Sequence, residues 1–145
     1  MNISFRKMQQ SDRDEVLAMM RVFYRSPALY TDGSEEIFES DFNHCVNDCP
    51  YLDGYMIEMD ETVCGYSMIA KSFSTEFGKP CIWVEDLYLK ENGRGLGIGS
   101  RFFDYLEKQY TDVVYRLEVE EENDSAIHLY RKKGYGVLPY MEMKK

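Results

Sequence analysis

The sequence predicts a mixed α/β fold in a single domain, built around a mostly antiparallel sheet that includes one parallel pair of strands. Segments of strand composition alternate with segments whose apolar residues recur at helical spacing. One stretch in the second half reads as strand, loop, helix and strand, and such a unit must cross over to pair in parallel. With 145 residues, 44% of them hydrophobic, the chain is long enough to bury a proper core and too short for two ordinary domains.

The first third predicts one strand and two helices. Residues 3–7 have strand composition, and Ser11 with Asp14 forms a variant of the capping box just before an apolar stripe at helical spacing. After a turn-rich stretch, Ser34 is suited to cap a second helix that ends near residue 50. The order is therefore strand, helix, helix.

The middle third predicts three strands. Residues 54–59 and 63–72 are expected to form a hairpin, although the connecting Asp60-Glu61 pair is not one of the favoured turn sequences. After a loop, residues 82–89 form the next strand. The turn type of the hairpin stays open.

The last third predicts a helix, a strand, a second helix and a final strand. The first of these helices has an apolar face formed by Ile98, Phe102, Leu106 and Tyr110. Residues 113–119 return to strand composition, and residues 125–133 form a helix with Gly134 as its C-terminal stop. Residues 135–143 are expected to form the last strand.

Charge and composition narrow the class of protein. The net charge of −9 argues against nonspecific binding to nucleic acid or an anionic membrane, and a charged ligand would more plausibly be cationic. No apolar stretch is long enough to span a bilayer, and the first thirty residues do not have the pattern of a signal peptide. Four irregularly spaced cysteines fit reduced thiols, so we expect a cytoplasmic protein.

The sequence predicts no metal site. His44, Cys45 and Cys49 are close in sequence, but a second pair of cysteines or histidines is missing. We expect Cys45 to pack in the core and His44 to be exposed.

A glycine-rich loop indicates a site for a diphosphate. Gly95, Gly97 and Gly99 alternate between a predicted strand and a predicted helix, where they leave backbone N–H groups open and the helix dipole adds partial positive charge. Arg94 at the entrance adds a cationic donor.

Three cofactor classes compete for this loop. A nucleotide-binding Walker loop requires Gly-Lys-Ser/Thr at its end, which is absent. A dinucleotide turn requires Gly-x-Gly-x-x-Gly early in the chain, whereas Ser100 occupies the last position here; Glu118, about twenty residues on, keeps this alternative open. The third class is the diphosphate of coenzyme A.

Two motifs give a specific resemblance. Residues 94–99, Arg-Gly-Leu-Gly-Ile-Gly, match the pattern Gln/Arg-x-x-Gly-x-Gly/Ala of the GNAT N-acetyltransferase family, and a strand of the family's usual form, residues 84–89, precedes them. Downstream, Asn123, Ala126, Tyr130, Gly134 and Tyr135 follow the spacing of the family's second motif. The chain thus resembles this family along nearly its whole length, as one domain over residues 1–145. The resemblance implies a sheet splayed at the parallel pair, with helices on both faces.

The resemblance also implies acetyl-CoA as cosubstrate and names its contacts. The backbone of Leu87 and Leu89 would pair with the pantetheine arm and direct an N–H at the acetyl carbonyl, as an oxyanion hole does. The loop would bind the phosphates, and Asn123 would contact pantetheine. The implied set is Leu87, Tyr88, Leu89, Arg94, Gly95, Leu96, Gly97, Ile98, Gly99, Ser100, Asn123 and Ser125.

Acetyl transfer to an amine needs a base and an acid. Tyr130 stands at the family's general-acid tyrosine, and a phenol stays protonated at neutral pH. Glu85 resembles the glutamate of polyamine acetyltransferases and is the candidate base. Strand alternation places it with Trp83 and Leu87, opposite Asp86, so the face that lines the cleft decides between the two acids. Glu118 and Glu120 are further candidates.

The acceptor amine would be bound by the first two helices and the loop between them, as the resemblance implies. We expect Tyr24, Tyr30 and Glu36, with Glu118 from the later strand, to contact it. Aromatic and carboxylate groups together suit a cationic amine.

Two function hypotheses follow from the motifs. The first is an N-acetyltransferase in which a primary amine attacks acetyl-CoA directly, because neither motif contains a cysteine to carry the acetyl group. The alternative is a noncatalytic acyl-CoA-binding or regulatory module; a nucleotide-dependent redox enzyme is a third. Only ten residues follow Tyr135, whereas the family usually closes with two paired strands, so we expect a homodimer that completes the sheet.

Overall fold

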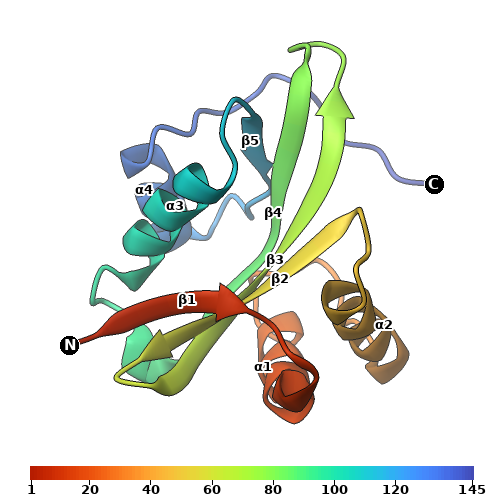
Figure 1. The fold of residues 1–145 in the computed structure, drawn as a ribbon. Coiled ribbons are helices and arrows are strands. Elements are labelled where there is room, and N and C mark those ends of the chain that lie inside the picture. The colour runs from red at the N-terminus through yellow and green to blue at the C-terminus, as the bar shows by residue number, and fades with distance from the viewer.

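The computed structural model describes all residues, 1–145, and contains one five-stranded sheet in the order β1-β2-β3-β4-β5 (Figure 1). The strands are β1 (Ile3–Lys7), β2 (Leu52–Met59), β3 (Thr62–Ser74), β4 (Lys79–Leu89) and β5 (Val114–Leu117). The first four pair antiparallel, and β4 pairs with β5 in parallel. The predicted mixed fold is confirmed.

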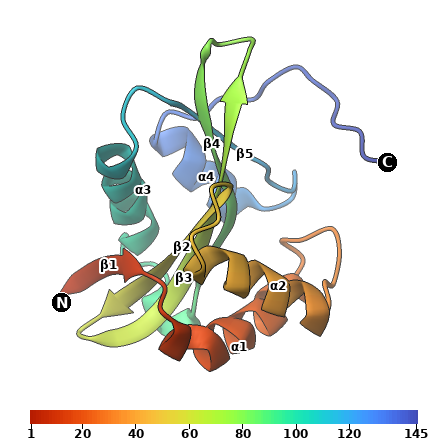
Figure 2. The same ribbon diagram turned by 45° about the vertical axis from the view of Figure 1, so that its right-hand side comes forward.

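Four helices cover both faces of the sheet, α1 and α2 on one and α3 and α4 on the other (Figure 2). They are α1 (Arg13–Tyr24), α2 (Glu35–Val46), α3 (Ile98–Gln109) and α4 (Asp124–Lys132), with short 3₁₀ turns η1 (Gln10–Asp12) and η2 (Glu91–Gly93). None of these helices has the length and apolar character that crossing a membrane requires.

The sheet divides the interior into two apolar cores. On the α1/α2 face, Met20, Phe42 and Tyr66 belong to a cluster of buried side chains. On the α3 face, Phe102 and Leu106 belong to a second cluster. Burial of such side chains from both faces is the main force that holds a sheet and its helices together.

The β2–β3 hairpin forms as predicted, through an unusual turn. Asp60 and Glu61 both have positive φ, 51° and 66°, which is the requirement of a type I′ turn. The carboxylate of Asp60 accepts a hydrogen bond from the backbone N–H of Asn2 at 2.8 Å. This side-chain contact helps a residue other than glycine to occupy the left-handed region.

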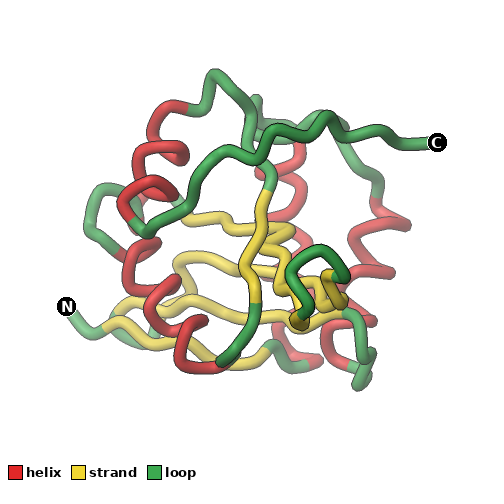
Figure 3. Tube along the Cα trace, turned by 90° about the horizontal axis from the view of Figure 1, so that it is seen from above, coloured by secondary structure: helices red, strands yellow, loops and turns green.

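The predicted last strand, residues 135–143, is wrong. The chain after α4 runs as a loop without strand structure (Figure 3). Gly136 weakens a strand and Pro139 lacks the N–H that a ladder needs, and the segment is held instead through the Tyr140 hydroxyl, which donates to Glu76. As a result β5 is the last strand of the sheet.

Candidate active site

The two parallel strands separate and leave a cavity between them. Pairing runs from Cys81 with Val114 to Val84 with Leu117. Beyond Val84, β4 continues to Leu89 paired with β3 on one edge only. A cavity of about 110 Å³, here called the strand cleft, opens at this point. It is lined by Phe23, Ala28, Leu29, Val84, Glu85, Leu87, Glu118, Val119, Asn123, Ala126 and Tyr130. An extended ligand could pair with the free edge of β4 there.

The glycine loop lies at the start of α3. Gly95 and Gly97 have φ of 72° and 77°, a backbone conformation that glycine adopts without strain, and an added Cβ at either would meet nothing within 4 Å. The surface above both glycines is therefore open. The first backbone hydrogen bond of α3 runs from Arg101 N–H to Gly97 O, so the N–H groups of the preceding turn lie outside the helical ladder and can bind an anion.

Gly99 has a different role in the same loop. An added Cβ would lie 2.9 Å from Cδ2 of Leu129, so this glycine lets α3 and α4 approach closely. Arg94 spans the loop: its Nε donates to the carbonyl of Leu89 at 2.8 Å, and its guanidinium lies 5.7 Å from the ring centroid of Tyr88. The remaining guanidinium N–H groups can still serve a phosphate.

Glu85 is the extra residue of a β-bulge in β4. Met68 pairs with Asp86 and Ile69 with Val84, so Glu85 has no partner in β3. The bulge shifts the alternation of side chains, because Val84 and Leu87 both pack on the α3-side core. The expectation that Glu85 shares a face with both Trp83 and Leu87 is therefore wrong, since regular alternation does not run through a bulge.

A second and larger cavity lies on the opposite side of β4. It has a volume of about 410 Å³ and is called here the acceptor groove. Its lining comes from α1, α2, the segment after α2 and strands β2 to β4: Tyr24, Ser40, Asp41, His44, Cys49, Tyr51, Leu52, Met68, Ala70, Glu85 and Asp86. Glu85 lines both cavities, so the bulge places one carboxylate between them.

The acceptor groove carries three carboxyl groups, and the only basic side chain that lines it is His44, whose charge lowers the pKa of Asp41. Asp41, Glu85 and Asp86 line it, none of them takes part in an ion pair, and no lysine or arginine is among its lining residues. Burial raises the pKa of Asp41 and of Asp86, the latter to about 6. Desolvation, followed by the charges of Asp86 and Glu142, raises the pKa of Glu85. A cation bound here would relieve this repulsion.

Tyr130 and Glu118 both line the strand cleft. The ring of Tyr130 packs against Phe103 at 5.7 Å and Tyr135 at 6.1 Å between centroids, and burial raises the pKa of its hydroxyl, which keeps it protonated. A hydrogen bond shared with Glu142, together with desolvation, raises the pKa of Glu118 to about 7. The cleft thus holds a proton donor and a carboxyl group that titrates near neutrality.

The sequence comparison decides the family. Residues 15–135 match the Acetyltransferase (GNAT) family. The chain belongs to this family. A thialysine N-epsilon-acetyltransferase from Sus scrofa is 27% identical over 144 residues, which cover 92% of this chain and 84% of the relative. The chain is an acetyl-CoA-dependent acetyltransferase of the GNAT family.

Solved structures support the GNAT fold. A possible acetyltransferase from Clostridium difficile 630 superposes with a TM-score of 0.83 at 17% identity, covering 99% of this chain and 96% of the other. A predicted acetyltransferase from Clostridium acetobutylicum, solved with acetyl-CoA, superposes with a TM-score of 0.74 at 17% identity, with coverage of 99% and 96%.

The cofactor residues expected from the GNAT motifs fall into two places. Leu87 and Asn123 line the strand cleft together with the predicted acid Tyr130, and the glycine loop lies at the start of α3. Tyr88 and Leu89 do not line the cleft. Asn123 also caps α4, because its side chain accepts the N–H of Ala126 at 3.3 Å. Ser125 is exposed and bonds to Asn123 rather than lining the cleft.

The acceptor residues expected from the sequence are only partly brought together. Tyr24 lines the acceptor groove, but its hydroxyl donates to Asp86 at 2.8 Å. Tyr30 is 90% exposed and Glu36 is also exposed, and neither lines a cavity. Glu118 lines the strand cleft rather than the acceptor groove.

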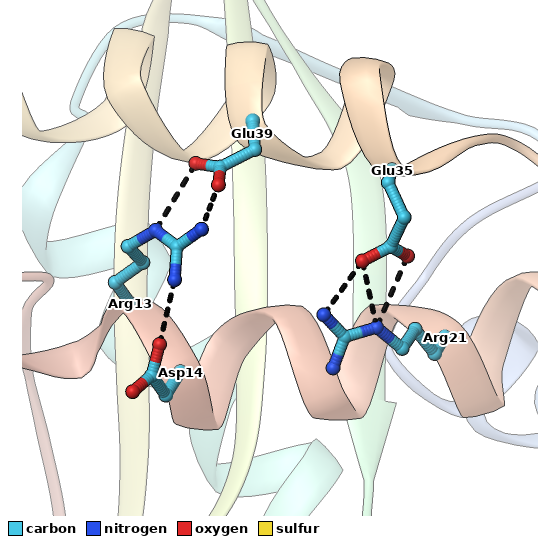
Figure 4. A network of polar contacts seen from close by, with 5 residues as sticks. All are labelled: Arg13, Asp14, Arg21, Glu35 and Glu39. Atoms are coloured by element: carbon cyan, nitrogen blue, oxygen red, sulfur yellow. Dashed lines mark hydrogen bonds and ion pairs between the residues drawn. The ribbon is translucent and has the colours of Figure 1, made fainter.

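Neighbouring glutamates of α2 bind α1 instead of an open cavity (Figure 4). Glu39 pairs with Arg13, and Glu35 pairs with Arg21 at 2.6 Å. These pairs hold the two helices side by side. Their carboxylates are therefore already neutralised.

Several residues that line the acceptor groove were not predicted from the sequence. Asp41, Cys49 and Tyr51 belong to no motif, and they meet β4 only because α2 packs across the sheet. The one sequence feature that could have indicated the groove is the pair of adjacent acids, Glu85 and Asp86, within an apolar strand. No group of three or more histidine, cysteine, aspartate or glutamate side chains is placed to hold a metal ion.

Proposed function

We propose that the enzyme acetylates a primary amine, which enters from the acceptor groove and attacks acetyl-CoA directly in a ternary complex. The observation that carries this proposal is the position of Glu85 at a β-bulge, where it borders both cavities. A carboxylate there can hold the ammonium and take its proton on one side of the strand, next to the acetyl group on the other.

The residues divide the proton transfers between them. Glu85 acts as base toward the amine, directly or through one water, and its raised pKa makes it a better proton acceptor than an ordinary carboxylate. Tyr130 donates to the leaving sulfur, since its hydroxyl has no hydrogen-bond partner in the protein and its pKa is raised by burial. Glu118, which also lines the strand cleft, is the second candidate base.

The chain's backbone holds the cosubstrate, which supplies an activated thioester. The open N–H groups around Gly95 and Gly97 bind its diphosphate, assisted by Arg94. The free edge of β4 beyond Val84 pairs with its extended arm, and a backbone N–H near Leu87 stabilises negative charge on the carbonyl oxygen during attack. Tyr88, Leu89, Leu96, Ile98, Ser100, Asn123 and Ser125 complete the proposed contact set.

The acceptor is proposed to be a cationic amine on a flexible chain. The carboxylates of the acceptor groove favour such a ligand, and a relative named for acetylating thialysine supports it. We also propose a single domain over residues 1–145, working in the cytoplasm as a homodimer. The open outer edge of β5 and the exposed side chains after α4 support the dimer.

The alternative is a module that binds acetyl-CoA without catalysis, in which Tyr130 only packs. The test is turnover of acetyl-CoA with spermidine, lysine, thialysine and an alanine-terminated peptide, followed by Tyr130→Phe. We expect turnover with at least one cationic amine. Tyr130→Phe should lower kcat by about 100-fold or more, in the range of a lost general acid, with unchanged affinity for acetyl-CoA by calorimetry.

Tyr105→Phe is the matched control, because Tyr105 is an aromatic residue of α3 that packs against Phe5 and Tyr55 and lines neither cavity. It should keep wild-type kcat. Binding of acetyl-CoA without turnover of any amine would favour the noncatalytic module.

A further inference from the structure

The carboxylate of Asp86 is the most completely buried acid in the protein, and three hydroxyl groups hold its residue in place. Asp86 is 3% exposed. Its two carboxylate oxygens accept hydrogen bonds from Tyr24 at 2.8 Å and Tyr66 at 2.7 Å. Ser67 donates to its backbone carbonyl at 2.6 Å. Side chain and main chain are therefore both fixed.

These contacts surround the bulge. Asp86 directly follows the bulged Glu85, and its partners come from α1 and from β3, the strand that the bulge disrupts. A bulge leaves one residue of the ladder unpaired, so it needs other contacts to hold a single conformation. Tyr24, Tyr66 and Ser67 supply them.

Burying a neutral residue at this position would cost less free energy than burying a carboxylate. No cation contacts Asp86, and a buried carboxylate that lacks a cationic partner is costly even when hydrogen-bonded. Asp53 shows the contrast, because Lys7 and Lys71 pair with it at 3.2 and 3.0 Å. The charge at Asp86 therefore serves something other than stability.

We propose that Asp86 is a positioning residue of the active site: by ordering Tyr24 and Tyr66 around the β-bulge, it fixes Glu85 between the strand cleft and the acceptor groove. This inference rests on the proposed function, since it assigns a role to the geometry around the base. Asp86 itself need not contact either substrate. Its ionised form accepts both tyrosine hydrogen bonds at once. In a protonated carboxyl one oxygen carries the proton and acts as a donor instead.

The ionisable groups around Asp86 come from every element packed against it. They are Tyr24 on α1, Asp41 and Cys45 on α2, Tyr66 on β3 and Glu85 on β4. The two tyrosine hydrogen bonds lower its pKa, whereas burial and Asp41 raise it. Removing one hydroxyl should therefore raise the pKa of Asp86 and move the acidic limb of the rate profile to higher pH.

The first test is Asp86→Asn, which keeps the shape and removes the charge. We expect acetyl-CoA affinity to stay within about twofold by calorimetry, and kcat/KM for the best amine of the panel to fall about tenfold or more, as when a reacting group is displaced. Because the pKa of Asp86 is raised to about 6, its ionised form disfavours folding above that pH. The Tm of Asp86→Asn at pH 8 should therefore not be lower than that of the wild type.

Asp53→Asn is the matched control. This carboxylate also accepts a hydrogen bond from a tyrosine, Tyr110, but lies outside both cavities and has lysine partners that lower its pKa. Its replacement should lower Tm and leave kcat/KM unchanged. Tyr66→Phe supplies the readout that a purely structural role would not give: the acidic midpoint of kcat/KM should rise by about half a unit or more.

The outcomes separate the two proposals. If the wild type acetylates an amine and Asp86→Asn keeps kcat/KM within twofold, the role of Asp86 is refuted and the proposed function stands. The proposed role is equally refuted if Asp86→Asn lowers the Tm, the acetyl-CoA affinity and the activity together, because replacing a residue with a purely structural role would do so. A wild type that binds acetyl-CoA and turns over no amine of the panel overturns the proposed function itself.

Discussion

Single carboxyl groups set the chemistry around the strand cleft. Glu85, Glu118 and Glu142 come from β4, from the chain after β5 and from the C-terminal segment. Glu142 raises the pKa of both other residues, and Glu85 raises that of Glu118. The interaction with Glu142 is the first cause that raises the pKa of Glu118 to about 7, and we predict that the two carboxyl groups share a proton. A proton shared in this way is available at neutral pH, close to where we propose that the amine loses one.

Glu142→Gln should remove this coupling. A glutamine amide can donate to the Glu118 carboxylate, so the pKa of Glu118 should fall from about 7 toward the ordinary value of 4.5. A carboxyl-carbon NMR titration of the wild type and the variant measures it directly. Glu120→Gln removes a nearby acid that makes no such bond, and Glu118 should then still titrate near 7. Identical titrations in wild type and Glu142→Gln would rule the shared proton out.

At the scale of elements, the regular parts of the fold were predictable and the irregular parts were not. The five strands, the four helices and the parallel crossover follow from periodicity, because it is a local property of the chain. Ser34 caps α2 as predicted, but the Ser11–Asp14 capping box does not form, since α1 begins at Arg13 with Asp12 as its N-cap. The bulge at Glu85 is set by a register shift against Met68 and Ile69, and nothing in the local sequence of β4 marks it. The glycine loop between β4 and α3 was predictable because its glycines carry the signal themselves, and its binding of a diphosphate stays a prediction.

The acceptor groove could not be predicted in this way. Its wall depends on how α2 packs across the sheet. Asp41 and Asp86 both line it, although they are 45 positions apart in the chain and belong to no common motif. Tyr30 and Glu36, which were expected to contact the acceptor, lie on the loop and at the helix start, where side chains remain exposed. Long-range packing, rather than composition, decides which side chains meet.

The glycine loop offers an element-scale prediction with an internal control. Gly97→Ala should cost about 1 kcal/mol of unfolding free energy, because an alanine must adopt a left-handed φ. It should also weaken acetyl-CoA binding about tenfold or more, since the new methyl covers the open amides. Thermal unfolding and calorimetry measure the two effects.

Gly78→Ala is the control for strain alone. Gly78 has a φ of 66° and nothing within 4 Å of an added Cβ, but it lies in the β3–β4 turn. It should lose similar stability and keep full acetyl-CoA affinity. Equal loss of affinity in both variants would mean that the loop is not the diphosphate site.

At the scale of the whole molecule, the sheet is incomplete at one edge. β5 has four residues and a neighbour only in β4, so its outer edge presents unpaired backbone groups. The nine residues after Gly136 end the chain beside it without strand structure, and Val137, Met141 and Met143 are 86% to 90% exposed. Exposed apolar side chains next to an open edge favour association with a second copy.

The homodimer is therefore testable by removing this segment. We expect the full chain to sediment as a dimer at tens of micromolar and a chain ending at Gly136 to sediment as a monomer, because the missing residues supply the contact between copies. The Tm of the isolated fold should change little, since the segment contributes only exposed contacts, the Tyr140–Glu76 hydrogen bond and the interaction of Glu142 with Glu118, and no buried side chain. Tyr140→Phe removes only that bond and should leave the dimer intact. Sedimentation of the full chain as a monomer at this concentration would show that the open edge of β5 is tolerated in a single copy.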